Sequence, residues 1–390
     1  MHILEIPSFF PPYGGLFCLD QAKALKALGH EVRILSNVQL GMTIGLKGYL
    51  TLPTNRYEHE MDGVMVYQSY QRGIPKVIKY NVERWVAIVV SMFKEYVQKY
   101  GRPDILNAHC CKWAGYAAMQ ISRDTGIPYV ITENLAYLDY VTEFGNPPGD
   151  TWQIPLLKEA FQHAAKVLPV SSELVHDISG YFGTDYRWEI ISNTIDVDYF
   201  QYQERPSLEN RPFRFFCPAI FVHRKGYDIL FAAYSQLRRQ CKNVELHIAG
   251  RATDSEKCRK LMRHYGVEGE VVVHGETDKA GVRDILYQSD ALVLATRSEV
   301  QPLSILEAMS TGIPVISTEC IPNCLRIEGG CVIVPIDNSD AFANAMQQVM
   351  QQTPIDGRTL SAKVAAIASP QVVGKKLESI LSKIVEHQEE

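Results

Sequence analysis

The sequence predicts an α/β protein built from two doubly wound domains that face each other across a cleft. Short apolar runs typical of buried strands alternate with amphipathic, helix-like segments through both halves of the chain. A polar, proline-bearing and aperiodic stretch, residues 201–212, separates the two halves. The length of 390 residues also exceeds what one ordinary core supports. We expect a first domain over 1–203, a second over 204–370 and a terminal helix over 371–390.

The composition is that of a globular protein with substantial cores. Apolar residues make up 46% of the chain and charged residues 21%. The net charge of -5 provides no basic surface, so we expect no nucleic acid partner. Nine cysteines without a framework spacing, and no basic-then-apolar leader before the first strand, predict reduced thiols in a cytoplasm. Cysteines in His109-Cys110-Cys111 and Cys320-x-x-x-Cys324 are interpreted as small buried residues, because neither motif has a second pair of metal ligands.

The first half opens with a strand around 3–6, a loop containing Gly14 and Gly15, a helix that ends at Gly29, and a second strand at 31–36. Glycines let a backbone approach a ligand closely, and a helix N-terminus attracts phosphate. A lone glycine pair is more often a turn, so this signal is weak by itself.

The remainder of the first half carries further strand and helix patterns. The apolar run 85–93, flanked by lysines and an arginine, predicts a buried helix or, as a second choice, a helix that lies on a membrane surface. A buried-strand pattern ends at His109, and a lone histidine at such a position is more often structural than catalytic. Further predicted strands cover 50–53, 64–67, 103–109, 127–134, 167–170 and 189–196, with helices through 114–118 and after a cap at Ser171 or Ser172.

The second half repeats the alternation. Strands are predicted at 213–219, 244–251, 271–276, 291–295, 314–317 and 332–335, and helices at 282–289, 339–352 and 372–387, with another carrying Leu230, Ala233 and Leu237. Arg224 and Lys225 precede Gly226 and the start of a helix. The compact ammonium of a lysine and the planar guanidinium of an arginine are both suited to binding a diphosphate. The alternative is a solvated basic turn.

Two carboxylates bracket the loop and helix that follow the strand at 291–295. Glu299 lies just past that strand and Glu307 in the first turns of the helix, which is where an open α/β sheet places its ligand. A structural alternative is that Ser304 and Glu307 form a capping box, with Pro302 in the first helical turn.

The run from Glu299 to Ile316 resembles the signature of retaining glycosyltransferases of family 4: a Glu, seven residues, Glu-Ala-Met, and a Gly-x-Pro-Val strand entry. The resemblance covers nearly the whole chain. It implies the glycosyltransferase B (GT-B) fold, in which a C-terminal helix crosses back onto the first domain. It also implies that Glu299 lies near the donor sugar's hydroxyls, that Glu307 reaches the ribose, and that the backbone of Pro302, Leu303 and Ser304 faces the sugar and diphosphate. Pro302 removes one N–H from that loop.

The same resemblance assigns roles to other residues. It implies that Gly14 and Gly15 lie over the diphosphate, that His109 contacts a donor hydroxyl, and that Lys225 neutralises the leaving group. Relatives carry an arginine where this chain has Ile220, and we expect Arg224 to compensate. Gly250, Arg251 and His274 would lie in loops near the nucleotide. The catalytic residues would be His109, Glu299 and Lys225.

The predicted function is transfer of a hexose from a nucleotide-diphosphate sugar to a glycan or lipid-linked acceptor, with retention of the anomeric configuration. We expect no cofactor and no metal, and interpret Asp196-Val197-Asp198 as incidental. The resemblance suggests surface polysaccharide or O-antigen synthesis in the cytoplasm, with peripheral contact at the inner membrane surface. Two alternatives stay open at this point: a sugar-nucleotide 2-epimerase of the same architecture, and a non-catalytic nucleotide-sugar-binding protein.

Overall fold

The computed structural model describes residues 1–41, 45–52, 54–205, 207–352 and 355–389. The chain forms two compact units, which we call unit 1 (Met1–Thr194 with Pro370–Glu390) and unit 2 (Ile195–Ser369). The predicted boundary between residues 203 and 204 lies inside unit 2. The physical reason is burial, because Ile195 and Phe200 belong to the hydrophobic core of unit 2.

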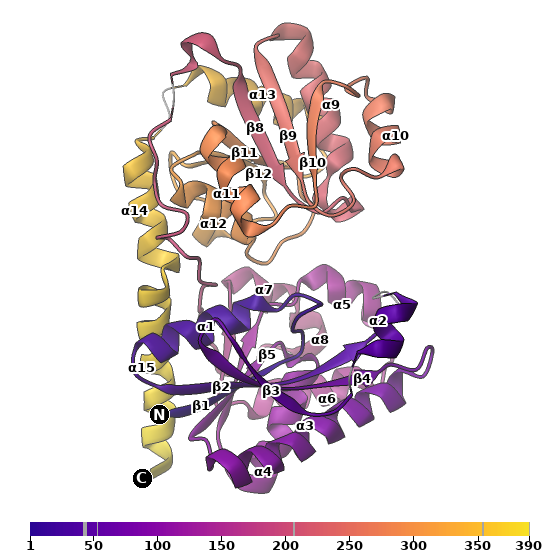
Figure 1. Ribbon diagram of the computed structural model, residues 1–390, viewed down its shortest axis with the longest axis vertical. Coiled ribbons are helices and arrows are strands. Elements are labelled where there is room, and N and C mark those ends of the chain that lie inside the picture. Colours follow the sequence, from indigo (N-terminus) through magenta and orange to yellow (C-terminus); the bar gives the residue numbers. More distant parts are fainter. Residues whose placement is uncertain (42–44, 53, 206, 353–354, 390) are drawn as a thin grey trace. The chain divides into compact units, whose positions relative to one another are not determined.

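Unit 1 contains a seven-stranded sheet in the order β3-β4-β2-β1-β5-β6-β7 (Figure 1). Only β3 is antiparallel, and it pairs with β4 at one edge. The strands are β1 (His2–Pro7), β2 (Glu31–Leu40), β3 (Tyr57–Met61), β4 (Val64–Arg72), β5 (Ile105–His109), β6 (Tyr129–Glu133) and β7 (Lys166–Pro169). The helices are α1 (Leu16–Ala27), α2 (Leu46–Thr51), α3 (Ile78–Tyr100), the π-helical turn η2 (Cys111–Gly115), α4 (Tyr116–Thr125), α5 (Tyr137–Phe144), α6 (Gln153–His163), α7 (Ser172–Asp177), α8 (Ser179–Phe182) and α15 (Pro370–Glu389).

The C-terminal helix α15 belongs to unit 1, although it is the last element of the chain. Its apolar residues Val373, Leu377 and Leu381 join the same core as Leu19 and Leu25 of α1. Gly374 lies where an added Cβ would come 3.2 Å from Ala24, so the two helices pack closely at this point. A C-terminal helix on the first unit is the arrangement expected from the resemblance.

Unit 2 contains a six-stranded parallel sheet in the order β10-β9-β8-β11-β12-β13. The strands are β8 (Phe213–Pro218), β9 (Val244–Ala249), β10 (Val271–Gly275), β11 (Ala291–Leu294), β12 (Val315–Thr318) and β13 (Cys331–Val334). The helices are α9 (Tyr227–Gln240), α10 (Glu256–His264), α11 (Lys279–Gln288), α12 (Leu303–Ser310), α13 (Ser339–Gln351) and α14 (Gly357–Ala368), with short 3₁₀ turns η3 (Leu208–Asn210), η4 (His223–Lys225) and η5 (Asn323–Leu325).

Both sheets have a point at which the strand order reverses direction. In unit 1 this switch point lies between β1 and β5, and in unit 2 it lies between β8 and β11. Loops leaving the two strands on either side of such a point diverge to opposite faces of the sheet, which leaves space for a ligand at the carboxyl ends of the strands. The fold therefore marks one position in each unit where functional residues are expected.

Several local predictions need correction. Residues 50–52 of the predicted strand lie in or directly after helix α2, while residue 53 falls outside the described residues. The predicted strand 189–196, all of whose residues are described, is not a strand. Glu189 and Ile191 donate backbone hydrogen bonds to β7, but the isolated bridge to β7 lies at Trp188, just before this stretch. The helix predicted through 114–118 starts as the π-helical turn η2. The ambiguity over the cap of α7 resolves to Ser171, whose hydroxyl accepts from the backbone N–H of Leu174.

The apolar run 85–93 lies within α3 and is a core helix. Trp85, Val89 and Phe93 on its inner face are buried. Among the residues that the structure describes, no helix combines the length and the apolar character needed to cross a bilayer. All nine cysteines are described, and all are free thiols.

Candidate active site

Two turns meet at the switch point of unit 2. One is η4, which leads from β8 into α9, and the other is the loop from β11 into α12. Gly226 allows the approach, because an added Cβ would lie 1.8 Å from the carbonyl oxygen of Ala295, and its φ of 64° is left-handed. The backbone N–H of Arg297 donates to the carbonyl of Arg224 across 2.8 Å. These contacts bring side chains about seventy residues apart in sequence into one site.

The carboxylate of Glu299 is the centre of this site. Lys225 Nζ lies 2.5 Å from Glu299 Oε1, and Arg224 Nη1 lies 3.6 Å from Glu299 Oε2. The hydroxyl of Thr296 also donates to Oε1, across 2.9 Å. The Glu299 side chain is only 7% exposed, so its charge requires these partners. The structure thus brings together Glu299, Lys225 and Arg224, all three of them predicted site residues.

Arg297 holds the η4 turn in place, and the sequence reading missed it. Its guanidinium forms a two-bond ion pair with Asp228 in the first turn of α9, donates to the carbonyl of His223 across 2.6 Å, and reaches Asp337 across 2.7 Å. Burial by itself would raise the pKa of Asp228, but the hydrogen bonds and charge of Arg297 outweigh it, and the pKa is lowered. The signal available in the sequence was an arginine directly before Ser298-Glu299.

The start of α12 differs from the predicted capping box. Pro302 is the N-cap residue rather than the first helical residue, and no side chain caps the helix there. Leu303 and Ser304 are therefore the first two helical residues, whose N–H groups an α-helix leaves without helical partners. Glu307 follows on the same helix and is half-buried. The structural alternative for this motif is wrong at Ser304, and the first turn of α12 keeps donors at the carboxyl edge of the sheet.

Of the predicted nucleotide-loop residues, Gly250 and Arg251 follow β9, whereas His274 lies within β10, next to its last residue. Gly250 has a φ of 134°, and an added Cβ would lie 2.4 Å from the carbonyl oxygen of Ala219. The carbonyl of the exposed Arg251 accepts from the N–H of Phe221 across 2.9 Å, which ties this turn to the one after β8. His274 is exposed and lies 3.0 Å from a ring nitrogen of His247. Burial and then the neighbouring His247 lower the pKa of His274.

At the switch point of unit 1 the chain turns sharply after β1. Gly15 is the N-cap of α1 with a φ of 84°, and an added Cβ would lie 1.9 Å from the carbonyl oxygen of Phe9. Gly14 also has a positive φ, of 90°, but nothing lies within 4 Å of its added Cβ. Gly15 therefore has a packing requirement that Gly14 lacks.

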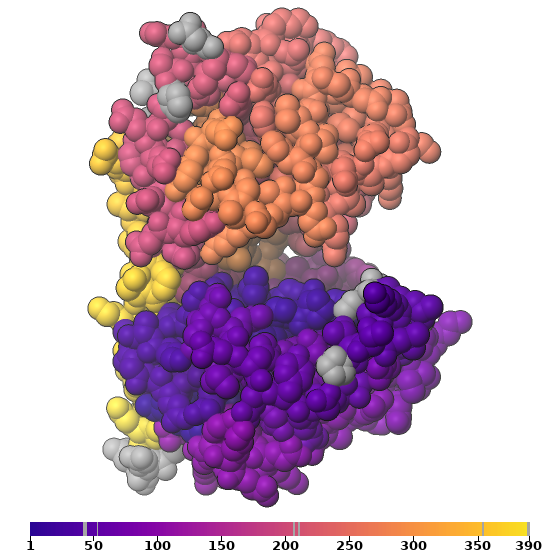
Figure 2. Space-filling view, in the orientation of Figure 1, coloured from indigo at the N-terminus to yellow at the C-terminus, as the bar shows by residue number. Residues whose placement is uncertain are grey.

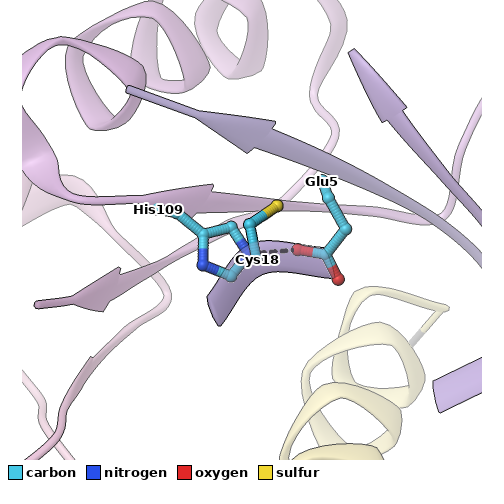
Figure 3. A group of neighbouring side chains, drawn as sticks. All are labelled: Glu5, Cys18 and His109. Atoms are coloured by element: carbon cyan, nitrogen blue, oxygen red, sulfur yellow. Dashed lines mark hydrogen bonds and ion pairs between the residues drawn. The ribbon is translucent and has the colours of Figure 1, made fainter. Parts of the chain in front are cut away.

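His109 lies at the end of β5 and is fully buried. Its Nε2 is 2.6 Å from Glu5 Oε2 on β1, and Cys18 of α1 lies against the pair (Figure 3). Among the described residues, His109 Nδ1 and Glu5 Oε1 are buried without hydrogen-bond partners. Burial, followed by the charge of Glu5, raises the pKa of the Cys18 thiol. The imidazole does not face solvent, so its contact with a donor hydroxyl stays a prediction.

The ligand atoms of Glu5, Cys18 and His109 lie within 4.8 Å of one another, which is compatible in principle with a metal ion. The geometry fits a hydrogen bond better. Tetrahedral zinc ligands are separated by roughly 3.3 Å given their bond lengths, whereas Glu5 Oε2 and His109 Nε2 are 2.6 Å apart. We describe this group as a buried Glu5–His109 pair. Its signal in the sequence was a carboxylate in the middle of the apolar strand Ile3-Leu4-Glu5-Ile6.

A cavity of about 460 Å³ opens beside the turn after β1. Aromatic side chains from the loop after β1, from α3 and from η2 form much of its wall; they are Phe9, Phe10, Tyr13, Trp85 and Trp113. We call it the aromatic cavity. Trp113 is stacked on Trp152 at a centroid distance of 5.6 Å, which fixes one wall.

Two charged side chains, Lys112 and Glu143, also line the aromatic cavity and form an ion pair. Burial lowers the pKa of Lys112 to about 8, and the carboxylate of Asp139 opposes that shift. A cavity with aromatic walls and few polar groups is typical of small-molecule sites. The sequence reading placed the acceptor side in this region but did not identify these residues.

Two α/β units with largely parallel sheets, and with polar side chains gathered at the carboxyl ends of their strands, are the architecture of the GT-B class of glycosyltransferases. A family model described as Glycosyltransferase Family 4 matches residues 14–199, and one described as Glycosyl transferases group 1 matches residues 212–352. Together the two models cover most of the chain, and the chain belongs to the family 4, or group 1, glycosyltransferases.

Relatives among curated proteins span most of the chain. It is 27% identical over 338 residues to the teichuronic acid biosynthesis glycosyltransferase TuaC of Bacillus subtilis, covering 82% of this chain and 81% of that one. It is 24% identical over 403 residues to the colanic acid biosynthesis glycosyltransferase WcaL of Escherichia coli, covering 95% and 97%.

Solved structures share the fold. The sucrose-phosphate synthase of Thermosynechococcus elongatus superposes with a TM-score of 0.79 at 18% identity, covering 99% of this chain and all of the other. HepE of Anabaena, solved in complex with UDP and glucose, superposes with a TM-score of 0.73 at 16% identity, covering 98% and 100%. At these identities the likeness confirms the predicted GT-B fold.

Proposed function

We propose that this glycosyltransferase moves a hexose from a nucleotide-diphosphate sugar to a hydroxyl of a glycan or lipid-linked acceptor in surface polysaccharide synthesis, with retention at the anomeric carbon. The observation that carries the proposal is the cluster of Glu299, Lys225 and Arg224 at the switch point of unit 2. The names of the relatives, which concern teichuronic and colanic acid synthesis, support the substrate class.

In the proposed donor complex the diphosphate replaces Glu299 as the partner of the two cations. Lys225 and Arg224 are 14% and 29% exposed, so both can turn toward an incoming anion. The released Glu299 carboxylate then accepts hydrogen bonds from sugar hydroxyls, and the N–H groups of Leu303 and Ser304 add positive potential. Glu307, on the same helix, binds the ribose. In this proposal Gly250, Arg251 and His274, at the carboxyl ends of β9 and β10, contact the base.

The proposed reaction breaks the bond between the anomeric carbon and the diphosphate oxygen. The acceptor oxygen forms the new bond, its proton passes to the departing diphosphate, and the products are the glycoside and the nucleoside diphosphate. Charge develops on the leaving group, and Lys225 and Arg224 are placed to stabilise it. In this proposal the positive charges of Lys225 and Arg224 neutralise the diphosphate without a metal ion. Glu299 orients the sugar and does not form a covalent intermediate.

Asp196, in the Asp196-Val197-Asp198 motif, takes part in a turn. Asp196 Oδ1 accepts the backbone N–H of Tyr199 across 2.9 Å, and the carbonyl of Asp196 accepts from Phe200. This carboxylate therefore holds a turn, so no metal role is proposed for the motif. The roles of Gly14, Gly15 and His109 toward the donor stay predictions from the family resemblance.

The aromatic cavity is the proposed site for the acceptor sugar. The flat C–H face of a pyranose packs well on an aromatic ring, and hydroxyls can bond to the Lys112–Glu143 pair. Phe9 supplies a ring from the loop after β1, and Trp113 supplies one from η2. A neutral sugar fits this wall better than a strongly anionic one, because the two charges that line it are already paired.

The first test is a thermal-shift panel with UDP, GDP, ADP and their sugars. A ligand at 100 times its dissociation constant stabilises the folded state by about 2.7 kcal/mol. We expect one nucleotide series to shift the wild type and to lose most of the shift in Lys225→Ala. The matched control is Lys363→Ala, an exposed lysine of unit 2 on α14. Equal shifts in the wild type and Lys225→Ala would overturn the donor assignment.

The second test uses the donor so identified. We expect nucleoside diphosphate to be released only when acceptor glycan is added, and the product to keep the anomeric configuration of the donor by NMR. Release without acceptor would indicate an epimerase or a hydrolase, and binding without release would indicate a non-catalytic protein. Either result would contradict the proposed reaction.

A further inference from the structure

A row of side-chain amides leads from the core of unit 1 to the wall of the aromatic cavity. Asn37 and Gln39 lie on β2, and Gln71 lies opposite Gln39 on the neighbouring strand β4. Asn37 and Gln71 are buried, whereas Gln39 is exposed and lines the cavity. Because buried amides are costly unless they are hydrogen-bonded, the bonding of the inner amides decides which atoms of Gln39 can meet a ligand.

The hydrogen bonds along this row run in one direction. Asn37 Nδ2 donates to Gln71 Oε1 across 3.3 Å, and Gln71 Nε2 donates to Gln39 Oε1 across 2.8 Å. Gln71 Nε2 also donates to the backbone carbonyl of Asn81 across 3.1 Å. A carbonyl only accepts, so this contact fixes the orientation of the Gln71 amide. The Gln39 atom that meets Gln71 is therefore the oxygen, and no acceptor within the described part of the chain meets the Gln39 N–H groups.

The amide of Gln39 lies flat against Gly73. A Cβ added at Gly73 would lie 3.1, 3.2 and 3.2 Å from Nε2, Cδ and Cγ of Gln39, so Gly73 covers the face of the amide and leaves its N–H edge open. The N–H of Gly73 donates to the carbonyl of Leu40 across 2.9 Å, and the hydroxyl of Tyr49 donates to the carbonyl of Gly73 across 3.1 Å. Tyr49 belongs to α2, which Figure 2 shows in dark indigo on the outside of unit 1. These contacts hold Gly73, and with it Gln39, in place.

Gln39 thus presents a hydrogen-bond donor in a largely aromatic wall, while its own acceptor is already used. A carbonyl oxygen attached to a methyl group complements such a wall, because the oxygen accepts the N–H and the methyl group packs on the rings. A sugar hydroxyl would bring a proton that needs an acceptor of its own. A carboxylate would bring a charge to a wall in which Lys112 and Glu143 are already paired.

We propose that Gln39 selects an acceptor sugar that carries an acetamido group. The carbonyl oxygen of that group accepts a hydrogen bond from Gln39 Nε2, and its methyl group packs on the aromatic wall of the cavity. Gln71 fixes the direction of the Gln39 amide and does not itself touch the sugar. This inference rests on the proposed function, because it takes the aromatic cavity as the acceptor site.

The test is titration of the full chain with methyl glycosides, followed by saturation-transfer NMR without donor. The probes are the methyl glycosides of glucose, N-acetylglucosamine and glucuronic acid, together with the corresponding galactose series. We expect the acetamido sugar of at least one series to bind about tenfold more tightly than its parent sugar, which is the effect of about one hydrogen bond. The uronic acid should bind no more tightly than the parent sugar.

Gln39→Glu is the most informative variant, because its carboxylate still accepts from Gln71 but cannot donate to the sugar. Gln39→Glu and Gln39→Ala should both lose the tenfold preference for the acetamido sugar. The matched control is Gln371→Glu, the same change at an exposed glutamine of α15, which should keep it. Trp113→Ala removes a ring of the cavity wall and should weaken the binding of every sugar that binds there.

Equal affinity for the acetamido sugars and their parents in both series would overturn the proposal, and so would tighter binding of a uronic acid. A preference that survives in folded Gln39→Glu would also overturn it, with folding checked by circular dichroism. If Trp113→Ala leaves sugar binding unchanged, or the wild type binds no sugar, the aromatic cavity is not the acceptor site and the proposed function fails at that point. The thermal shift with donor nucleotide should be the same in the wild type and Gln39→Glu, so the donor site is tested separately.

Discussion

The two units have the same strand order around their switch points and different chemistry at them. In unit 2, Lys225 and Arg224 from one loop meet Glu299 from another, and both cations stay partly exposed. In unit 1, Glu5 and His109 face each other out of reach of solvent, and an aromatic cavity opens beside the turn after β1. The scaffold decides where a ligand can bind, and the residues after each strand decide what it can be.

The two units share one structural feature, a glycine at the start of a helix. Gly15 in unit 1 and Gly226 in unit 2 each precede the helix that follows the first strand, and each has a left-handed φ. In both units the added Cβ would lie less than 2 Å from a backbone carbonyl oxygen. Each unit therefore uses a glycine to bring a helix N-terminus against the end of its sheet.

The largest expected effect on stability comes from replacing these two glycines. Gly15→Ala and Gly226→Ala should each lower the free energy of unfolding by about 2 to 6 kcal/mol, since a Cβ is forced into backbone and a non-glycine residue into positive φ. Urea unfolding followed by circular dichroism measures this change. Gly14→Ala is the matched control, because its Cβ meets nothing and only the positive φ costs stability. Equal losses at Gly14 and Gly15 would mean that the close approach is unimportant.

The second prediction contrasts the carboxylate of Glu5 in unit 1 with that of Glu299 in unit 2. Glu5→Ala leaves His109 buried without its partner and should destabilise the protein by about 3 to 5 kcal/mol. Glu299→Ala should cost only about 1 to 2 kcal/mol, since the freed Lys225 and Arg224 can reach water. Urea unfolding of both variants provides the comparison. Glu5→Gln keeps an acceptor for the imidazole and should recover part of the loss; no recovery would exclude the hydrogen bond as its cause.

The third prediction concerns turnover. Lys225→Ala should lower acceptor-dependent release of nucleoside diphosphate by about 10² to 10³-fold, which is the usual consequence of losing one group that stabilises developing charge. Its thermal unfolding midpoint should fall, because the Glu299 carboxylate, 7% exposed, loses its nearest cation. Turnover is therefore compared at a temperature at which circular dichroism shows that the variant is folded. Lys363→Ala should keep full turnover. Wild-type turnover in a folded Lys225→Ala protein would show that Lys225 takes no part in the reaction.

The smallest expected effect is a pH dependence in unit 1. Burial lowers the pKa of Lys112 to about 8, below the ordinary lysine value of about 10.4. Between these pH values Lys112 is protonated in the unfolded chain and largely neutral in the folded one, so the contribution of Lys112 to stability rises with pH. Lys112→Met lacks this dependence. Its stability relative to the wild type should fall by about 1 to 3 kcal/mol between pH 8 and pH 10.

Urea unfolding at several pH values measures the Lys112 effect, with Lys363→Met as the exposed control that should show no such trend. The opposite slope, with Lys112→Met gaining on the wild type as pH rises, would mean that the ion pair with Glu143 outweighs burial.

Much of the fold could be predicted because parallel strands buried on both faces are nearly continuous apolar runs. The strands at Ile105–His109 and Ala291–Leu294 are of this kind, and their ends carry His109 and lead to Glu299. The less regular parts were not predictable in this way. The helix α2 has no buried face to impose a periodic pattern, and the stretch 189–196 is extended without a strand partner along its length. The unit boundary was placed late because the core contacts of Ile195 and Phe200 have no signature in sequence spacing.

The sequence by itself determined the two sheets and the edge of the sheet at which Lys225 and Glu299 lie, whereas their ion pair is seen only in the structure. Local periodicity fixes the elements, and parallel topology brings the carboxyl ends of neighbouring strands together. Only the tertiary structure decided the pairing of Glu5 with His109, the hold of Arg297 on the η4 turn, and the exposure of the leucines of α2. Those features depend on how side chains from distant segments pack, which is set by the shape of the assembled unit and not by the spacing of residues along the chain.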